Sequence, residues 1–357
     1  MVRNNKLDVL RGVAVLLVLF RHLTLETHDN SFINLVFLGM RRIGWIGVDI
    51  FFVLSGYLVT RLLWREQSSL GKANVLRFIK RRSLKIFPLF YLLILGSLVL
   101  NTQHRQIDYK NLLVELVFVQ SYFDGLWSHT WSLSVEEHFY LLIASMFAVA
   151  TLSGTRNPHK LLLPLITLAV LSFGLRSYVS LTNMDYSFHT HISASYLRFD
   201  GLALGAITAI TTWRKNKVAA QITSRLKWLT IISTAVFTPY LVFHSQETSI
   251  VVRTIGFLLV AVLTSTLIVT ITLCPVENQN QNRTSLSTIV ARIGVDSYAT
   301  YLLHVPLFEV INSLTLDRFL PNWLVGTISI AIAMFAGRFV TQLVDQPLLR
   351  FRDRLCP

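Results

Sequence analysis

The sequence predicts an all-α integral membrane protein of about ten transmembrane helices, with both termini in the cytoplasm. Its 357 residues are 53% hydrophobic and only 15% charged, whereas a soluble domain carries about 25% charged residues. The apolar residues gather into long segments. Most of the 33 Lys and Arg residues stand in the short stretches between those segments, which is typical of multi-pass proteins oriented by basic cytoplasmic loops.

Each apolar segment of sufficient length predicts one helix, because about 20 residues cross the hydrocarbon of a bilayer. In chain order the apolar segments are 7–25, 44–63, 84–100, 111–123, 131–152, 161–181, 197–212, 228–244, 252–273, 294–313 and 322–343. Segment 111–123 is short and is interrupted by Glu115 and Gln120. We therefore predict that it does not span and belongs to an outer loop, 101–130, as a candidate re-entrant segment.

The basic loop 213–227 supports this count. It carries a cluster of cations, Arg214, Lys215, Lys217, Arg225 and Lys227, whereas 182–196 contains no Lys or Arg. The positive-inside rule places such a loop in the cytoplasm, and counting 111–123 as a span would put it outside.

A labelling experiment tests that topology. A cysteine introduced as Asn216→Cys should resist an impermeant thiol reagent in intact cells, because loop 213–227 faces the cytoplasm. A cysteine within 182–196 should react with the same reagent. Labelling of position 216 from outside would contradict the ten-helix prediction.

Charge and cysteine content exclude several classes of protein. The net charge is +14, but the cations lie in short loops between apolar segments, so we expect membrane lipids and not nucleic acid as partners. Cys274 and Cys356 both fall at predicted cytoplasmic ends, so we expect neither a disulfide nor a metal site. We expect one membrane domain over 1–357, with no soluble accessory domain and no cleavable signal peptide.

The first apolar segment carries ionisable residues that point to function. Arg11 and His22 are three helical turns apart, hence on one face and about 16 Å apart along the axis. An ionisable group within a membrane helix costs several kcal/mol unless it is paired or faces a cavity, so it is a functional candidate.

Asp49 in the second span stands at a depth similar to that of His22 on the neighbouring antiparallel helix. A carboxylate hydrogen-bonded to a histidine orients the ring and raises its basicity. We therefore expect Asp49 to meet His22, and activity to fall at low pH. The alternative is that Asp49 caps its helix while His22 reaches the membrane surface.

The inner loop 64–85 ends in a basic cluster immediately before a span, formed by Lys80, Arg81, Arg82 and Lys85. Such a cluster can orient the protein and attract anionic lipid. It can equally bind the phosphates of a nucleotide through charge-assisted hydrogen bonds. The residues alone leave both interpretations open.

Glu136 and Tyr140 lie one turn apart in HTWSLSVEEHFYLL, which enters the fourth span from outside. Glu136 could be an interfacial acid, or it could form an acidic outer pocket with Asp49 and His22. Arg198 opens the sixth span and His304 lies mid-span. We interpret His304 first as a helix-packing hydrogen bonder.

Five motifs together resemble the acyltransferase family 3 proteins, integral-membrane enzymes that transfer acetyl or other acyl groups, commonly to sugars of envelope polysaccharides. They are Arg11 and His22 with ten residues between them, VDIFFVLSGYLV, RRSLKIFPLFY, TWSLSVEEHFYL and YATYLLHVPLF. The motifs appear in the family's order and cover essentially the whole chain. The resemblance implies His22 as the catalytic histidine, Arg11 as its essential partner, and Asp49 and Glu136 as the acids of their motifs.

Two motifs depart from the family pattern. The arginine–two–arginine motif appears as Arg82 and Lys85, and lysine lacks the planar fork of arginine. The terminal glutamate–x–proline appears as Asp345, Gln346 and Pro347.

The residues and the resemblance together suggest a membrane-bound O-acyltransferase of the inner (plasma) membrane. In this hypothesis acyl-CoA, most simply acetyl-CoA, docks its phosphates at Arg81, Arg82 and Lys85, and no cofactor is tightly bound. His22 acts as general base on a hydroxyl of an extracytoplasmic or membrane-linked saccharide or glycolipid. The alternative is a non-catalytic transporter or flippase that uses the same buried ions. A membrane scaffold would leave Arg11 and His22 unexplained.

Overall fold

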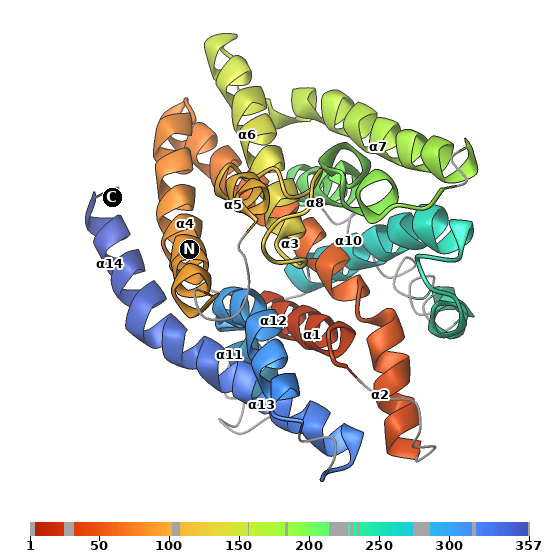
Figure 1. Cartoon of the computed structure of the whole chain (residues 1–357). Helices are drawn as coiled ribbons and strands as arrows, with labels where there is room; N and C mark the ends of the chain where they lie inside the picture. The colour runs from red at the N-terminus through yellow and green to blue at the C-terminus, as the bar shows by residue number, and fades with distance from the viewer. Residues whose placement is uncertain are drawn as a thin grey trace.

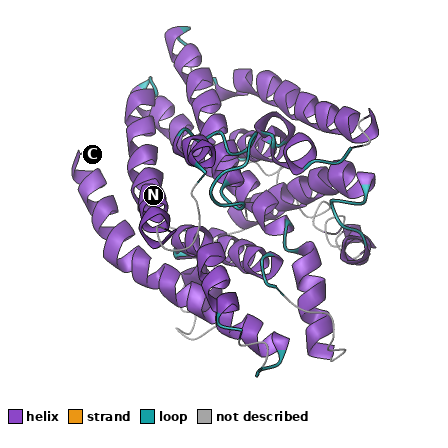
Figure 2. Ribbon diagram, viewed as in Figure 1, coloured by secondary structure: helices purple, strands orange, loops and turns teal. Residues whose placement is uncertain are grey.

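A computed structural model describes residues 4–24, 32–101, 108–155, 157–182, 185–213, 228, 232, 233, 236–273, 286–315 and 319–355. The described part is built of helices and their connections, with no strand (Figure 2). Residues 229–231, 234 and 235 of the predicted span 228–244 lie outside it, as do residues 214–227 and both cysteines. For these segments the predictions stand untested.

The helices follow the predicted order (Figure 1). Their bounds are α1 (Asn5–Arg21), α2 (Phe32–Ile43), α3 (Ile46–Leu70), α4 (Val75–Asn101), α5 (Tyr109–Leu116), α6 (Trp131–Leu152), α7 (Leu162–Thr182), α8 (Phe199–Thr211), α10 (Phe257–Leu273), α11 (Leu286–Val295), α12 (Ser297–Ser313), α13 (Asn322–Val340) and α14 (Gln346–Leu355). Short π-helical turns precede or extend three of them, namely η2 (His189–Ser193), η4 (Val252–Gly256) and η6 (Thr341–Asp345).

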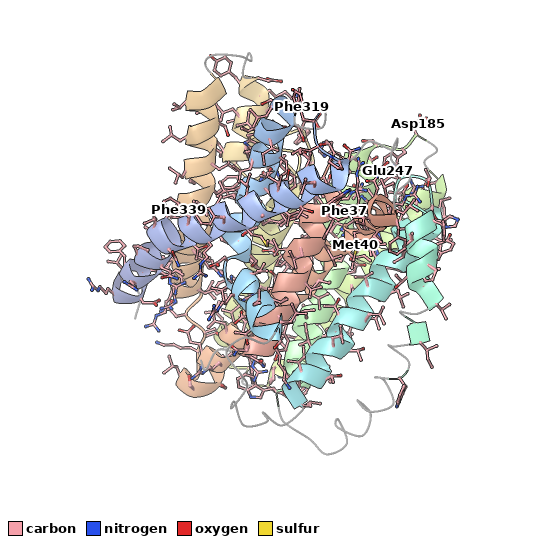
Figure 3. The ribbon with its side chains drawn as sticks, turned by 90° about the horizontal axis from the view of Figure 1, so that it is seen from below. Phe37, Met40, Asp185, Glu247, Phe319 and Phe339 are labelled. Atoms are coloured by element: carbon pink, nitrogen blue, oxygen red, sulfur yellow. The ribbon has the colours of Figure 1, made fainter. Side chains whose placement is uncertain are left out.

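Six helical stretches of the described residues are long and apolar enough to cross a membrane. They are Ile46–Leu70, Val75–Val99, Trp131–Leu152, Pro158–Thr182, Val252–Leu273 and Asn322–Leu355. Large apolar side chains such as Phe319 and Phe339 project from the surface, with exposed fractions of 82% and 55% (Figure 3). The prediction of an all-helical, multi-pass membrane protein is confirmed at this level, whereas the count of ten spans stays a prediction.

Helix α3 lies at the centre of the bundle, against α1, α6, α8 and α10. Glycines bring its backbone close to α8: a Cβ on Gly56 would stand 1.9 Å from the carbonyl oxygen of Leu202, and one on Gly205 would stand 2.0 Å from that of Val53. Small residues permit such close approach between membrane helices. The contact fixes the start of α8 beside the first turns of α3.

Two helices, α2 and α5, are much shorter than the membrane-spanning ones. Helix α5 has 8 residues and is therefore about 12 Å long, too short to cross a bilayer, which agrees with the non-spanning prediction for 111–123. Helix α2 lies in a stretch predicted as a loop. It exposes Phe32, Ile33 and Leu35 and ends in Arg41 and Arg42, a pattern typical of a helix lying in a membrane interface.

Candidate active site

Two cavities lie on either side of the first turns of α3. The larger, about 980 Å³, is lined by His22, Asp49 and residues of the loop before α6, and we call it the His22 cavity. The smaller, about 370 Å³, is lined by Arg11 and by side chains of α4 and α6, and we call it the Arg11 cavity. Val48 lines both. Arg11 and His22 therefore line two different cavities, although both lie on one face of α1.

His22 is the C-cap residue of α1, and its backbone N–H donates to the carbonyl oxygen of Leu19 at 3.2 Å. Its side-chain Nδ1 lies 3.0 Å from the carbonyl oxygen of Val18 and 3.1 Å from Nε2 of His304. The helix end and α12 thus hold the ring on one side while the residue lines the His22 cavity.

His22, His304 and His129 form a cluster of three imidazoles. The ring centroid of His304 lies 4.8 Å from that of His22 and 4.9 Å from that of His129, with edge-to-face geometry. Nε2 of His129 lies 3.2 Å from the carbonyl oxygen of Leu302. In the described part of the chain no group of His, Cys, Asp and Glu is arranged to hold a metal ion.

The sequence pattern does not reveal this cluster: it indicates a packing role for His304 and gives no signal that singles out His129. The three residues come from α1, the loop before α6 and α12. Only the tertiary fold brings them together, and the one available signal was the presence of histidines in or beside apolar segments.

The expected hydrogen bond between Asp49 and His22 is not what the structure shows. Asp49 lines the same cavity as His22, but its Oδ1 accepts from Nη2 of Arg198 at 2.7 Å. Arg198 also lies over the ring of Phe257, 3.8 Å from its centroid. A fully buried carboxylate is stabilised far more by a guanidinium than by a neutral imidazole, so the arginine takes the position expected for His22.

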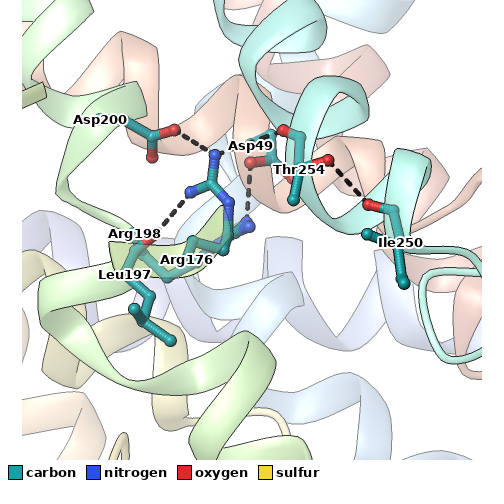
Figure 4. A network of polar contacts seen from close by, with 7 residues as sticks. All are labelled: Asp49, Arg176, Leu197, Arg198, Asp200, Ile250 and Thr254. Carbon is teal, nitrogen blue, oxygen red and sulfur yellow. Dashed lines mark hydrogen bonds and ion pairs between the residues drawn. The ribbon is translucent and has the colours of Figure 1, made fainter. Parts of the chain in front are cut away.

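A second buried pair adjoins the first (Figure 4). Arg176 donates to Oδ2 of Asp200 at 2.6 Å and to the backbone oxygens of Leu197 and Thr254. Two arginines and two aspartates from α3, α7 and the start of α8 thus fix the wall of the His22 cavity.

One interpretation of the sequence places Glu136 in an outer pocket with His22 and Asp49. The structure does not show this arrangement. Glu136 lines the Arg11 cavity, where Oε1 accepts from Ser55 and Oε2 from Tyr140, each at 2.7 Å. Glu136 lies five residues beyond the start of α6, about 7.5 Å deeper along the axis. That displacement carries it past the level of the His22 cavity.

The basic cluster of α4 divides between two environments. Arg82 and Lys85 line the Arg11 cavity, and the guanidinium of Arg82 lies 4.9 Å from the ring centroid of Tyr140. Arg81 points elsewhere, because neighbouring helix residues are about 100° apart, and it pairs with Asp353 of α14 at 2.8 Å. Arg11 itself forms an ion pair with Asp8 at 3.2 Å.

The loop that closes the His22 cavity is held by Glu115 of α5. The side chain of Glu115 is fully buried, and its Oε2 accepts from the backbone N–H of Leu126 at 3.1 Å. Burial raises the pKa of Glu115 to about 7. Gly125 leaves room for this carboxylate, since a Cβ there would stand 2.2 Å from Oε2 and the side chain of Glu115 would have to shift. The loop then presents Trp127 to the cavity.

Comparison with known families identifies the chain. A family model described as an acyltransferase domain, acyltransferase family 3, matches residues 4–341. The chain belongs to this family. The acyltransferase class expected from the five motifs is thereby confirmed.

Two relatives are similar over 96% of the chain. Peptidoglycan O-acetyltransferase OatA of Listeria monocytogenes is 27% identical, and O-acetyltransferase OatA of Staphylococcus aureus is 26% identical. The matches cover 55% and 56% of those proteins, so the chain spans about half the length of the curated relatives it matches. No solved structure gives a significant match.

Proposed function

We propose that this acyltransferase transfers an acetyl or other short acyl group from acyl-CoA in the Arg11 cavity to a saccharide hydroxyl in the His22 cavity. The observation that carries the proposal is a pair of cavities that share Val48 as a lining residue. Both cavities are lined by cations, but only the larger one is also lined by the imidazole of His22, so we assign the acceptor to the His22 cavity and the donor to the Arg11 cavity.

The Arg11 cavity suits the donor. Arg82 and Lys85 provide cations for phosphate groups, and Arg11 lines the same cavity. A volume of about 370 Å³ fits a narrow pantetheine arm and leaves the nucleotide at the cytoplasmic mouth. The side chains of Phe51 and Tyr301 then line the path toward Val48.

The His22 cavity suits a sugar. Trp45, Trp127 and Trp131 offer aromatic surface, and Asp124 and Glu247 supply hydrogen-bond acceptors. The two relatives are named for O-acetyl transfer, and one of them for peptidoglycan, which supports an envelope saccharide as the acceptor.

The proposed chemistry is acyl transfer with general-base catalysis. The acceptor hydroxyl oxygen attacks the thioester carbonyl carbon as Nε2 of His22 takes its proton. The carbon–sulfur bond then breaks, and the departing thiolate receives that proton from the imidazolium. The cavities hold both reactants in place, which converts a bimolecular encounter into an oriented one.

Two measurements test the function. Purified protein should transfer radiolabelled acetyl from acetyl-CoA to an isolated envelope saccharide, and mass spectrometry should find fewer O-acetyl groups on saccharides of cells that lack the protein. A transporter or flippase would move its cargo without consuming acetyl-CoA. Absence of acetyl transfer from a folded preparation, with unchanged saccharides in the cells, would overturn the proposal.

The division of the basic cluster gives a separate prediction. Arg82→Ala combined with Lys85→Ala should raise the KM for acetyl-CoA about tenfold or more with little change in kcat, since phosphate contacts act equally in ground and transition states. Arg81→Ala is the matched control and should leave the KM unchanged, because Arg81 pairs with Asp353 and does not line the cavity. An unchanged KM for acetyl-CoA in a double variant that inserts normally would show that Arg82 and Lys85 serve topology only.

A further inference from the structure

Two backbone carbonyls determine which nitrogens of the His22–His304 pair carry protons. Nδ1 of His304 is hydrogen-bonded to the carbonyl oxygen of Tyr301, and Nδ1 of His22 to that of Val18. A carbonyl oxygen can only accept, so each of these Nδ1 atoms must carry a proton. The assignment is thus made independently for both rings.

The hydrogen bond between the rings of His22 and His304 then has only one possible donor. His304 is fully buried and neutral, because an imidazolium there would lack the acidic partner that a buried cation needs. Its Nε2 therefore holds a lone pair, which faces Nδ1 of His22 at 3.1 Å. His22 Nδ1–H donates to that lone pair while also bonding Val18, and Nε2 of His22 remains an unprotonated base.

We propose that His304 is a positioning residue that accepts a hydrogen bond from His22 and fixes its ring in the Nδ1–H tautomer, with Nε2 presented to the acceptor. The inference rests on the function proposed above. In serine hydrolases an aspartate does this work. Here Asp49 is bonded to Arg198, and a neutral imidazole occupies the orienting position.

The surroundings of His304 support a positional role over a proton-relay role. His129 packs edge-on against it at 4.9 Å between centroids, and the Nδ1 of His129 is buried with no hydrogen-bond partner among the described residues. Burial lowers the pKa of His129 to about 3, so this neighbour stays neutral. Tyr301 donates to the carbonyl oxygen of His129 at 2.6 Å, which ties the loop before α6 to α12.

Two substitutions separate positioning from packing. In His304→Gln the amide oxygen can still accept from His22 Nδ1–H, so kcat should stay within about tenfold of wild type. In His304→Leu the acceptor is lost but the volume is kept, so kcat should fall by about 100-fold or more with the KM for acetyl-CoA unchanged, as expected for loss of the correct tautomer. His159→Gln, an exposed histidine of η1 (Pro158–Leu161), is the control and should match wild type.

The proposal is overturned if the glutamine and leucine variants, both folded, have the same kcat, because packing alone would then explain His304. A wild-type protein without transferase activity would instead refute the proposed function. ¹⁵N NMR of histidine-labelled protein gives a readout independent of activity. The signals of His22 are assigned as those that are absent from the spectrum of His22→Ala. In the wild-type protein they should show a proton on Nδ1 and none on Nε2. The opposite tautomer, with the proton on Nε2, would contradict the assignment.

Discussion

His22→Ala should reduce acetyl transfer by about a thousandfold while leaving the protein folded and inserted. A positioned general base contributes about 10²–10⁴ to rate, and removing the ring at the end of α1 disturbs little of the core because His22 is only half-buried. His22→Gln should be equally inactive, since an amide can hydrogen-bond but cannot take a proton from the acceptor. Initial rates at matched protein level, with acetyl-CoA and saccharide both saturating, provide the measurement.

The control for this experiment is His244→Gln. His244 is exposed, stacks on Tyr240 with 4.1 Å between ring centroids, and does not line the His22 cavity. Wild-type rates in both His22→Gln and the control would show that His22 is structural. Activity of the wild-type enzyme should also fall at low pH, because a protonated imidazole cannot act as a base.

The fold was predictable from sequence because long apolar segments separated by short basic loops indicate membrane helices. Helix α6 begins and ends where the apolar segment 131–152 does. Helix α2 was missed because it has only 12 residues and its amphipathic pattern lies within a stretch too short to span. Helix α14 was missed because it continues α13 beyond the apolar segment through the π-helical turn η6.

The candidate site was predictable in its residues but not in its partners. His22, Asp49, Arg82 and Lys85 do line cavities. Which residue each one meets depends on the rotation and depth of neighbouring helices, which hydropathy does not determine. The sequence therefore predicts His22 as the partner of Asp49. In the structure α3 and α8 approach closely at Gly56, and Asp49 pairs with Arg198 instead.

The buried pair of Asp49 and Arg198 leads to the second large expected effect, on stability. Both side chains are almost fully buried, with exposed fractions of 5% and 2%. Asp49→Leu or Arg198→Met should each lower the free energy of unfolding by about 3–5 kcal/mol, because either change leaves one charge buried without its partner. The melting temperature in detergent micelles should fall in both variants.

The double variant Asp49→Leu/Arg198→Met should melt above at least one of its parents, because replacing a whole buried ion pair by apolar side chains costs less than breaking it. Arg81→Leu, which breaks the partly exposed pair with Asp353, is the matched control and should cost less than about 1 kcal/mol. Strictly additive losses in the double variant would contradict direct coupling between Asp49 and Arg198. Asp49 would then have to stabilise the fold through a contact other than the one with Arg198.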